Sequence, residues 1–109
     1  MRTRVKRMLD YGIDEVRCKE LLELAKCEDN QRILEMAAKA SNDYLAQYLV
    51  ISLQKKGVGF RSLFKDEVYL PCTEDDFYAY KRRTLALFDI FLKVEEVLLE
   101  DLRIAPKYP

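Results

Sequence analysis

The sequence predicts an all-α fold, a compact bundle of five or six helices with a helix-turn-helix-like C-terminal half and a long last helix. Half of the 109 residues are hydrophobic and 35% are charged, while glycine and proline contribute only three residues each. Apolar residues recur at three- and four-residue steps along most of the chain, which is the spacing of one helix face. Glycines, prolines and N-cap residues divide this pattern into separate segments.

The N-terminal half divides into three expected helices. A short basic helix ends at Gly12, and Asp14 caps a second helix whose polar side is acidic. Asp29 or Asn30 starts the third helix. The apolar positions expected to face the core are Val5, Met8, Leu9, Val16, Leu21, Leu24, Ala25, Ile33, Leu34, Ala37 and Ala38.

The C-terminal half contains the remaining helices. Residues 41–43 cap a fourth helix that runs from Tyr44 to about Lys56, with Gly57 as its C-cap. A short helix follows at 60–65, and a loop at 66–72 leads to the last helix, at about 74–102. The apolar stripe of that helix comprises Phe77, Tyr80, Thr84, Leu87, Phe88, Phe91, Val94 and Leu98. Residues 1–104 therefore form one expected domain, and residues 105–109 a flexible tail.

The residue types present argue against catalysis. The chain has no histidine, which removes the commonest general base and the commonest zinc ligand. Its three cysteines, Cys18, Cys27 and Cys72, lack metal-binding spacing and suit a reducing, cytoplasmic compartment. Adjacent acids such as Glu95 and Glu96 point to different sides of a helix, whereas paired catalysis needs two carboxylates in one cleft. The sequence predicts a cytoplasmic, non-enzymatic protein with no metal, cofactor or membrane span.

Any nucleic-acid surface must be local, because nineteen basic and nineteen acidic residues cancel. Basic groups gather at the N-terminus, around the turn that contains Gly57, and in the segment YAYKRR of the last helix. If these groups converge, they form a patch that can hold phosphates; otherwise each is a solvated charge at a helix end. The candidate DNA-binding residues are Arg2, Arg4, Lys55, Lys56, Arg61, Tyr78, Lys81, Arg82 and Arg83.

Residues 44–88 have the order of a helix-turn-helix. The segment LVISLQKKGVGFRSLF (49–64) and then CTEDDFYAYKRRTL (72–85), with its core FY-x-Y-K-R-R-x-L, resemble the promoter-reading C-terminal domain of sigma factors, known as region 4. They also resemble the related ArpU-type regulators of Gram-positive phages and mobile elements. The resemblance implies a small transcriptional regulator that binds double-stranded DNA and touches RNA polymerase. It implies that Tyr78 and the basic run 81–83 face DNA, while Phe77, Tyr80 and Leu85 pack inside.

Other features favour a different function. Residues 74–76 are acidic, and the connection before them is longer than the motif usually has. Acids in a first helical turn also have a structural role, because each stabilises the helix dipole by about 0.3–1 kcal/mol. The acidic second helix and seven tyrosines suit a protein-interaction module, such as a phage-encoded inhibitor or adaptor that binds a host protein. The broad apolar stripe at 88–99 suits a homodimer.

Overall fold

The computed structural model describes the backbone of residues 7–104 and the side chains of residues 7–98. Its α-helices are α1 (Glu15–Ala25), α2 (Gln31–Asn42), α3 (Ala46–Gln54), α4 (Phe60–Leu63) and α5 (Glu74–Ile104). Three 3-10 turns, η2 (Met8–Tyr11), η3 (Glu28–Asn30) and η4 (Asp43–Leu45), join the N-terminal helices. The described part contains no strand, so the all-α prediction is confirmed.

The described residues form fewer substantial helices than predicted. Four of the helices have nine residues or more, and α4 is a single turn of four residues. The described part of the expected first helix is the 3-10 turn η2, which Gly12 ends in the left-handed region at φ 77°. A glycine is favoured there because a side chain would be strained. The described part of the bundle is therefore built from four substantial helices rather than five or six.

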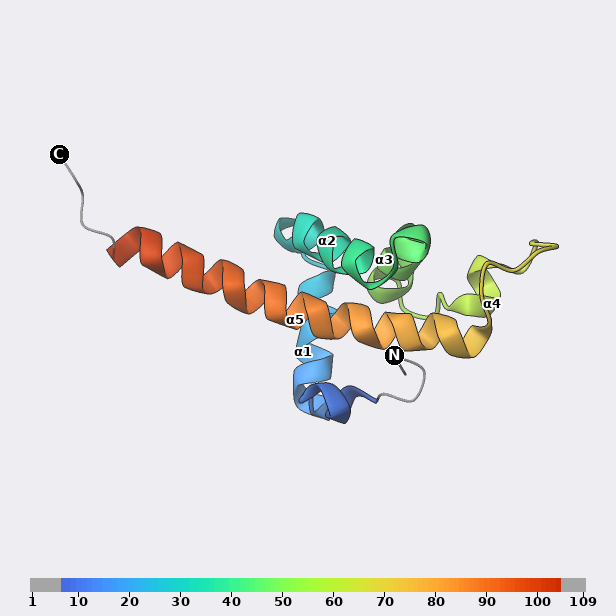
Figure 1. Cartoon of the computed structure of the whole chain (residues 1–109), viewed down its shortest axis with the longest axis horizontal. Helices are drawn as coiled ribbons and strands as arrows, with labels where there is room; N and C mark the ends of the chain where they lie inside the picture. The colour runs from blue at the N-terminus through green and yellow to red at the C-terminus, as the bar shows by residue number, and fades with distance from the viewer. Residues whose placement is uncertain (1–6, 105–109) are drawn as a thin grey trace.

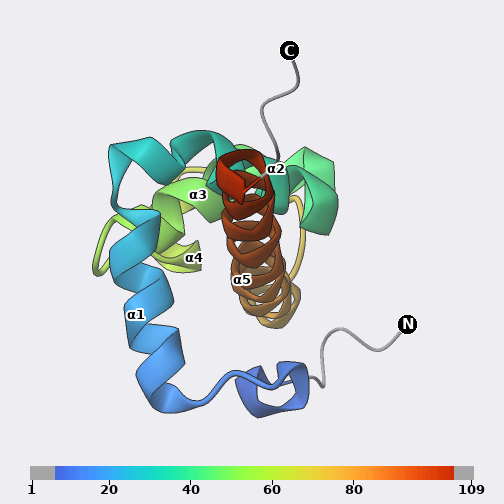
Figure 2. The same ribbon diagram turned by 90° about the vertical axis from the view of Figure 1, so that its left-hand side faces the viewer.

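Helix α5 is the axis around which the other helices pack. It contacts α1, α2, α3 and α4, and its longest interface is with α2. Its C-terminal half extends beyond the other helices (Figure 1). Viewed nearly end-on, α5 has α1 to one side and α2 above it (Figure 2). The first half of α5 thus lies in the bundle.

Side-chain caps fix several of these helix starts, and those at Asp14 and Asn42 lie where the sequence predicts them. The Asp14 carboxylate accepts a hydrogen bond from the backbone N–H of Arg17 at 2.8 Å. The Asn42 side chain accepts one from Leu45, and the Thr73 hydroxyl accepts one from Asp76, both at 3.1 Å. Each cap satisfies a backbone donor that has no partner within its own helix.

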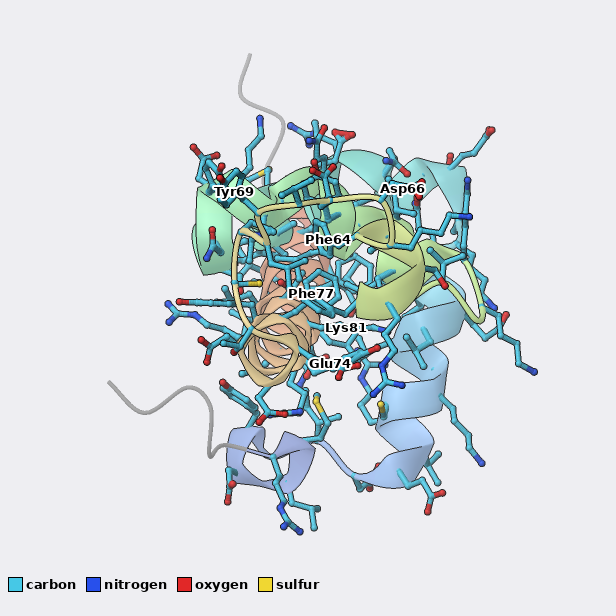
Figure 3. All side chains as sticks on the ribbon, turned by 90° about the vertical axis from the view of Figure 1, so that its right-hand side faces the viewer. Phe64, Asp66, Tyr69, Glu74, Phe77 and Lys81 are labelled. Atoms are coloured by element: carbon cyan, nitrogen blue, oxygen red, sulfur yellow. The ribbon has the colours of Figure 1, made fainter. Side chains whose placement is uncertain are left out.

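The core lies along the inner face of α2, along α3 and along the first half of α5. The predicted face of α2 is confirmed, since Ile33, Leu34, Ala37 and Ala38 are all buried. A cluster of rings joins α4 to α5: Phe77 lies 5.8 Å, centroid to centroid, from both Phe60 and Phe64. Phe64 and Phe77 point toward each other in Figure 3. These tilted and edge-on ring contacts hold the one-turn helix α4 in place.

Four apolar positions predicted to face the core are in fact exposed. The exposed fractions are 76% for Leu9, 69% for Val16, 51% for Val94 and 54% for Leu98. Val16 lies on the outer side of α1. Val94 and Leu98 belong to the C-terminal half of α5, which extends beyond the other helices (Figure 1), and no helix among the described residues buries them. The stripe on α5 reaches the core only as far as Leu92.

Some predictions concern residues outside those that the structure describes. These are the N-terminal residues Arg2, Arg4 and Val5, and the tail 105–109. Among residues 7–104, no helix has both the length and the apolar character needed to cross a membrane.

Candidate phosphate-binding cleft

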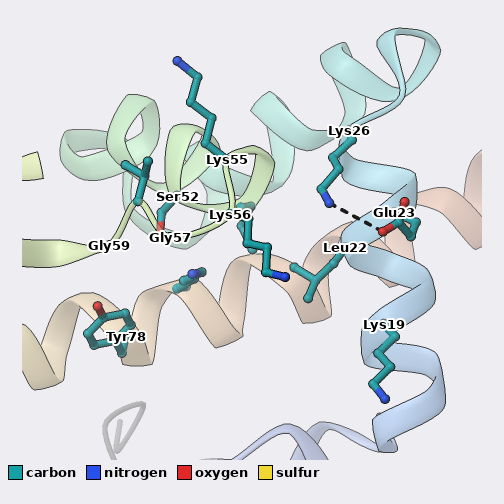
Figure 4. Close-up of a pocket in the computed structure, with 13 residues that line it drawn as sticks. Lys19, Leu22, Glu23, Lys26, Ser52, Lys55, Lys56, Gly57, Gly59 and Tyr78 are labelled. Atoms are coloured by element: carbon teal, nitrogen blue, oxygen red, sulfur yellow. Dashed lines mark hydrogen bonds and ion pairs between the residues drawn. The ribbon is translucent and has the colours of Figure 1, made fainter. Parts of the chain in front are cut away.

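A lysine-lined cleft of about 710 Å³ lies between α1, the turn after α3 and the first half of α5. Its five lysines come from three separate segments (Figure 4). They are Lys19 of α1, Lys26 at the C-cap of α1, Lys55 and Lys56 of the turn, and Lys81 of α5. We call this feature the lysine cleft.

The lysine cleft carries an excess of positive charge. Glu23 is the single acid in its lining, and its carboxylate pairs with Lys26 at 3.5 Å. Within the described residues, the other four lysines form no ion pair with a carboxylate. In Figure 4, Lys56 extends into the space between α1 and α5, whereas Lys55 points away from the other lysines. Such a cluster attracts anions and is not neutralised locally.

The wall formed by the turn depends on contacts between Gly59 and Tyr78. The Tyr78 hydroxyl oxygen accepts a hydrogen bond from the backbone N–H of Phe60 at 3.2 Å. A Cβ atom at Gly59 would collide with the same hydroxyl group. Gly57 adopts a left-handed conformation at φ 81°. The Gly-Val-Gly sequence therefore lets the turn pass close over α5, which places Lys55 and Lys56 at the edge of the lysine cleft.

Lys81 lies at the α5 wall of the lysine cleft. Its side chain is half-buried, and its Nζ atom is 5.8 Å from the centroid of the Tyr78 ring. Burial lowers the pKa of the Lys81 amine, while the nearby Cys18 thiol acts in the opposite direction. A cation that loses water without gaining a carboxylate is destabilised in its charged form. An anion bound beside Lys81 would remove that penalty.

The predicted DNA-binding residues are divided by the fold. Lys55, Lys56, Tyr78 and Lys81 come together in the lysine cleft. Arg61 lies outside its lining, and its Nε atom pairs with the Glu74 carboxylate at 3.2 Å. Arg82 and Arg83 are partly buried on α5 and are likewise outside the lining.

The acidic first turn of α5 has structural contacts. Glu74 pairs with Arg61, and the backbone N–H of Asp76 is capped by Thr73. Of the residues from 74 to 89, Asp75 is the one that is exposed; the others are buried or half-buried. The first four turns of α5 thus serve mainly as a packing element, and their basic side chains are partly covered.

Sequence reasoning missed Lys19, Lys26 and Ser52 as cleft residues. Lys19 and Lys26 are seven residues apart on α1, which places them on one helix face. That spacing could have identified the two lysines as neighbours. The acids around them led us to predict an acidic surface instead. Comparison of the chain with models of protein families, with curated proteins and with solved structures finds no match.

Proposed function

We propose that the protein is a small DNA-binding transcriptional regulator of the phage or mobile-element type, which holds the DNA backbone at the lysine cleft. One observation carries this proposal: three separate segments contribute four lysines without carboxylate partners in the described structure to the lining of one cleft. Lysines in such a group neutralise phosphates and release counterions, which supplies most of the affinity of non-specific DNA binding.

The helix order also supports a regulator. Helices α3, α4 and α5 follow one another as in the helix-turn-helix that residues 44–88 resemble. The phosphate contacts in this proposal come mostly from the turn and from α1. Such contacts fix the position of a protein on the duplex, while sequence is read at base edges. The resemblance to sigma factors also makes RNA polymerase the proposed protein partner.

The salt dependence of binding tests this proposal. Fluorescence anisotropy with a labelled duplex, including the region upstream of the gene for this chain, gives the affinity at several salt concentrations. Four lysines that each neutralise one phosphate predict a log–log slope of about −3 to −4. A flat salt dependence, or no binding at low salt, would contradict the proposal.

A protein-interaction module is the second candidate, and exposed apolar side chains favour it. In the loop before α5, Val68 and Tyr69 are 87% and 89% exposed, and Leu70 is 53% exposed. A second apolar surface on α5 comprises Ile90, Val94, Val97 and Leu98. Apolar and tyrosine side chains of this kind are common at interfaces with a host protein or with a second copy of the chain. Sedimentation equilibrium of the wild type and of a Val94→Gln/Leu98→Gln variant tests the homodimer.

A further inference from the structure

We propose that the floor of the lysine cleft binds a small phosphorylated ligand of about the size of a nucleoside diphosphate, and that this ligand competes with DNA. The ligand site is supported by a hydroxyl group, a charge pattern and a cavity that DNA binding does not explain. The proposal that the ligand competes with DNA depends, in addition, on the proposed function of DNA binding at the lysine cleft.

The hydroxyl group belongs to Ser52. Its side chain lines the cleft, the residue is only 5% exposed, and its Oγ atom has no hydrogen-bond partner within the described structure. A serine within a helix often donates to the carbonyl four residues earlier, here that of Tyr48, but no such bond is present. A buried polar group without a partner destabilises the folded protein. An acceptor oxygen of a ligand would satisfy the Ser52 hydroxyl.

The charge pattern selects an anion. Lys81 is half-buried and belongs to the same lining as Ser52. Lys56 extends into the space between α1 and α5 (Figure 4). Neither amine pairs with a carboxylate in the described part of the chain. A phosphate group carries three acceptor oxygens and close to two negative charges, so it can accept from two amines and a hydroxyl at once. A monocarboxylate carries one negative charge, so it balances only one of the two amines.

The cavity selects a ligand with an apolar or aromatic body. Leu22, Leu53, Val58 and the Tyr78 ring line the cleft together with the lysines. A volume of about 710 Å³ lies within the range of small-molecule sites. A duplex presents its phosphates on a convex surface, which leaves this apolar floor unfilled. A phosphate ester with a ring system occupies both the charged and the apolar parts.

Isothermal titration calorimetry tests the site with two probes, ADP and inorganic pyrophosphate. We expect ADP to bind saturably, and pyrophosphate to bind more weakly because it lacks the ring system. Ser52→Ala removes one hydrogen bond and is expected to weaken ADP binding about 3- to 10-fold. Lys81→Met and Lys56→Met each remove a charged donor and are expected to weaken it about tenfold or more.

Lys39→Met is the matched control, because Lys39 is an exposed lysine on α2 outside the lining. Lys56 is exposed in a turn, so its variant tests the site even if Lys81→Met fails to fold. Absence of saturable binding with both probes would overturn the proposal. Equal loss in Lys39→Met and Lys56→Met would also overturn it, because the effect would then be one of net charge.

The competition is tested by adding ADP to the complex with labelled duplex. We expect ADP to release the DNA from the wild type, and to release it less effectively from Ser52→Ala. ADP binding without any DNA binding would support the ligand site and contradict the proposed function. DNA binding without ADP binding would support the proposed function and contradict the ligand site. Simultaneous binding of both would overturn the competition.

Discussion

The hydroxyl oxygen of Tyr78 accepts a hydrogen bond from the backbone N–H of Phe60, with 3.2 Å between the two atoms. This bond joins the start of α4 to α5 across 18 residues of sequence. Tyr78 was predicted to face DNA, but its hydroxyl has this structural role and its ring lines the lysine cleft. The contact therefore connects the packing of α4 to the shape of the site.

Gly59→Ala tests this connection. The new Cβ atom would collide with the Tyr78 hydroxyl, so we expect the free energy of unfolding to fall by about 1–3 kcal/mol. Adding Tyr78→Phe should recover part of that loss, because it removes the atom that collides. Urea denaturation of the single and double variants measures the coupling.

Gly57→Ala provides the control in the same turn. Nothing lies within 4 Å of a Cβ atom at Gly57, but its positive φ makes any side chain strained. Its cost should therefore be unaffected by Tyr78→Phe. Recovery of both glycine variants, or of neither, would contradict the specific contact between Gly59 and Tyr78.

Asp89→Asn tests a buried ion pair that anchors α1 to α5. The Asp89 carboxylate is almost buried and accepts hydrogen bonds from the Arg17 guanidinium at 2.7 and 3.0 Å. Loss of the negative charge leaves Arg17 partly buried without it, so we expect a loss of about 1–3 kcal/mol in thermal or urea unfolding. Glu95→Gln is the control, since its pair with Arg32 spans 4.0 Å and is exposed. It should change stability by less than about 1 kcal/mol, and an equal effect of both variants would refute the distinction.

Glu74→Gln tests the effect of the acidic first turn on DNA binding. The change removes the carboxylate that pairs with Arg61, and stability should change by less than about 1 kcal/mol because Arg61 is exposed. The freed arginine adds a phosphate contact, so we expect DNA affinity at low salt to rise by a factor of about 3–10. Arg61→Ala in the same background should abolish the gain. An unchanged affinity would place Arg61 outside the DNA-binding surface.

Lys81→Met should change how the stability of the folded protein depends on pH. Burial lowers the pKa of the Lys81 amine in the folded protein below its ordinary value of 10.5, which the unfolded chain keeps. Between these two pKa values the unfolded chain binds more protons, so stability of the wild type rises with pH through that window. The Met variant lacks this rise. Its advantage over the wild type should therefore be largest at neutral pH and shrink toward pH 10.5.

Cys18 must be removed from this comparison. Burial raises the pKa of its thiol above 9.0, so it titrates in the same region and interacts with Lys81. Urea denaturation is therefore compared between Cys18→Ala and Cys18→Ala/Lys81→Met. An advantage of the Met variant that stays constant between neutral pH and pH 10.5 would contradict the burial of a charged amine.

Local features of the sequence predict much of this fold. Caps at Asp14, Asn42 and Thr73 act within one helical turn, so the sequence around each residue specifies them. The inner face of α2 was also predictable, because both of its neighbours are part of the chain. Val16 and Val94 were predicted wrongly because periodicity identifies an apolar face without identifying what covers it.

The site was less predictable because it depends on tertiary contacts. Composition and spacing selected Lys55, Lys56 and Lys81, but not the helix that faces them. The lysines of α1 enter the site through the packing of α1 beside α5. Arg61 and Glu74 form an ion pair although they are 13 residues apart in the sequence. No local sequence rule predicts that these two side chains meet.

Charge reversal in the lysine cleft tests the central claim most directly. Lys55→Glu/Lys56→Glu and the control pair Lys39→Glu/Lys65→Glu change the net charge equally, and all four lysines are exposed. In anisotropy titrations with duplex DNA, we expect the cleft variant to lose about tenfold or more in affinity and its salt slope to shrink by about 2. The control should stay within about threefold of the wild type. Equal losses in both variants, or none in the cleft variant, would contradict DNA binding at the lysine cleft.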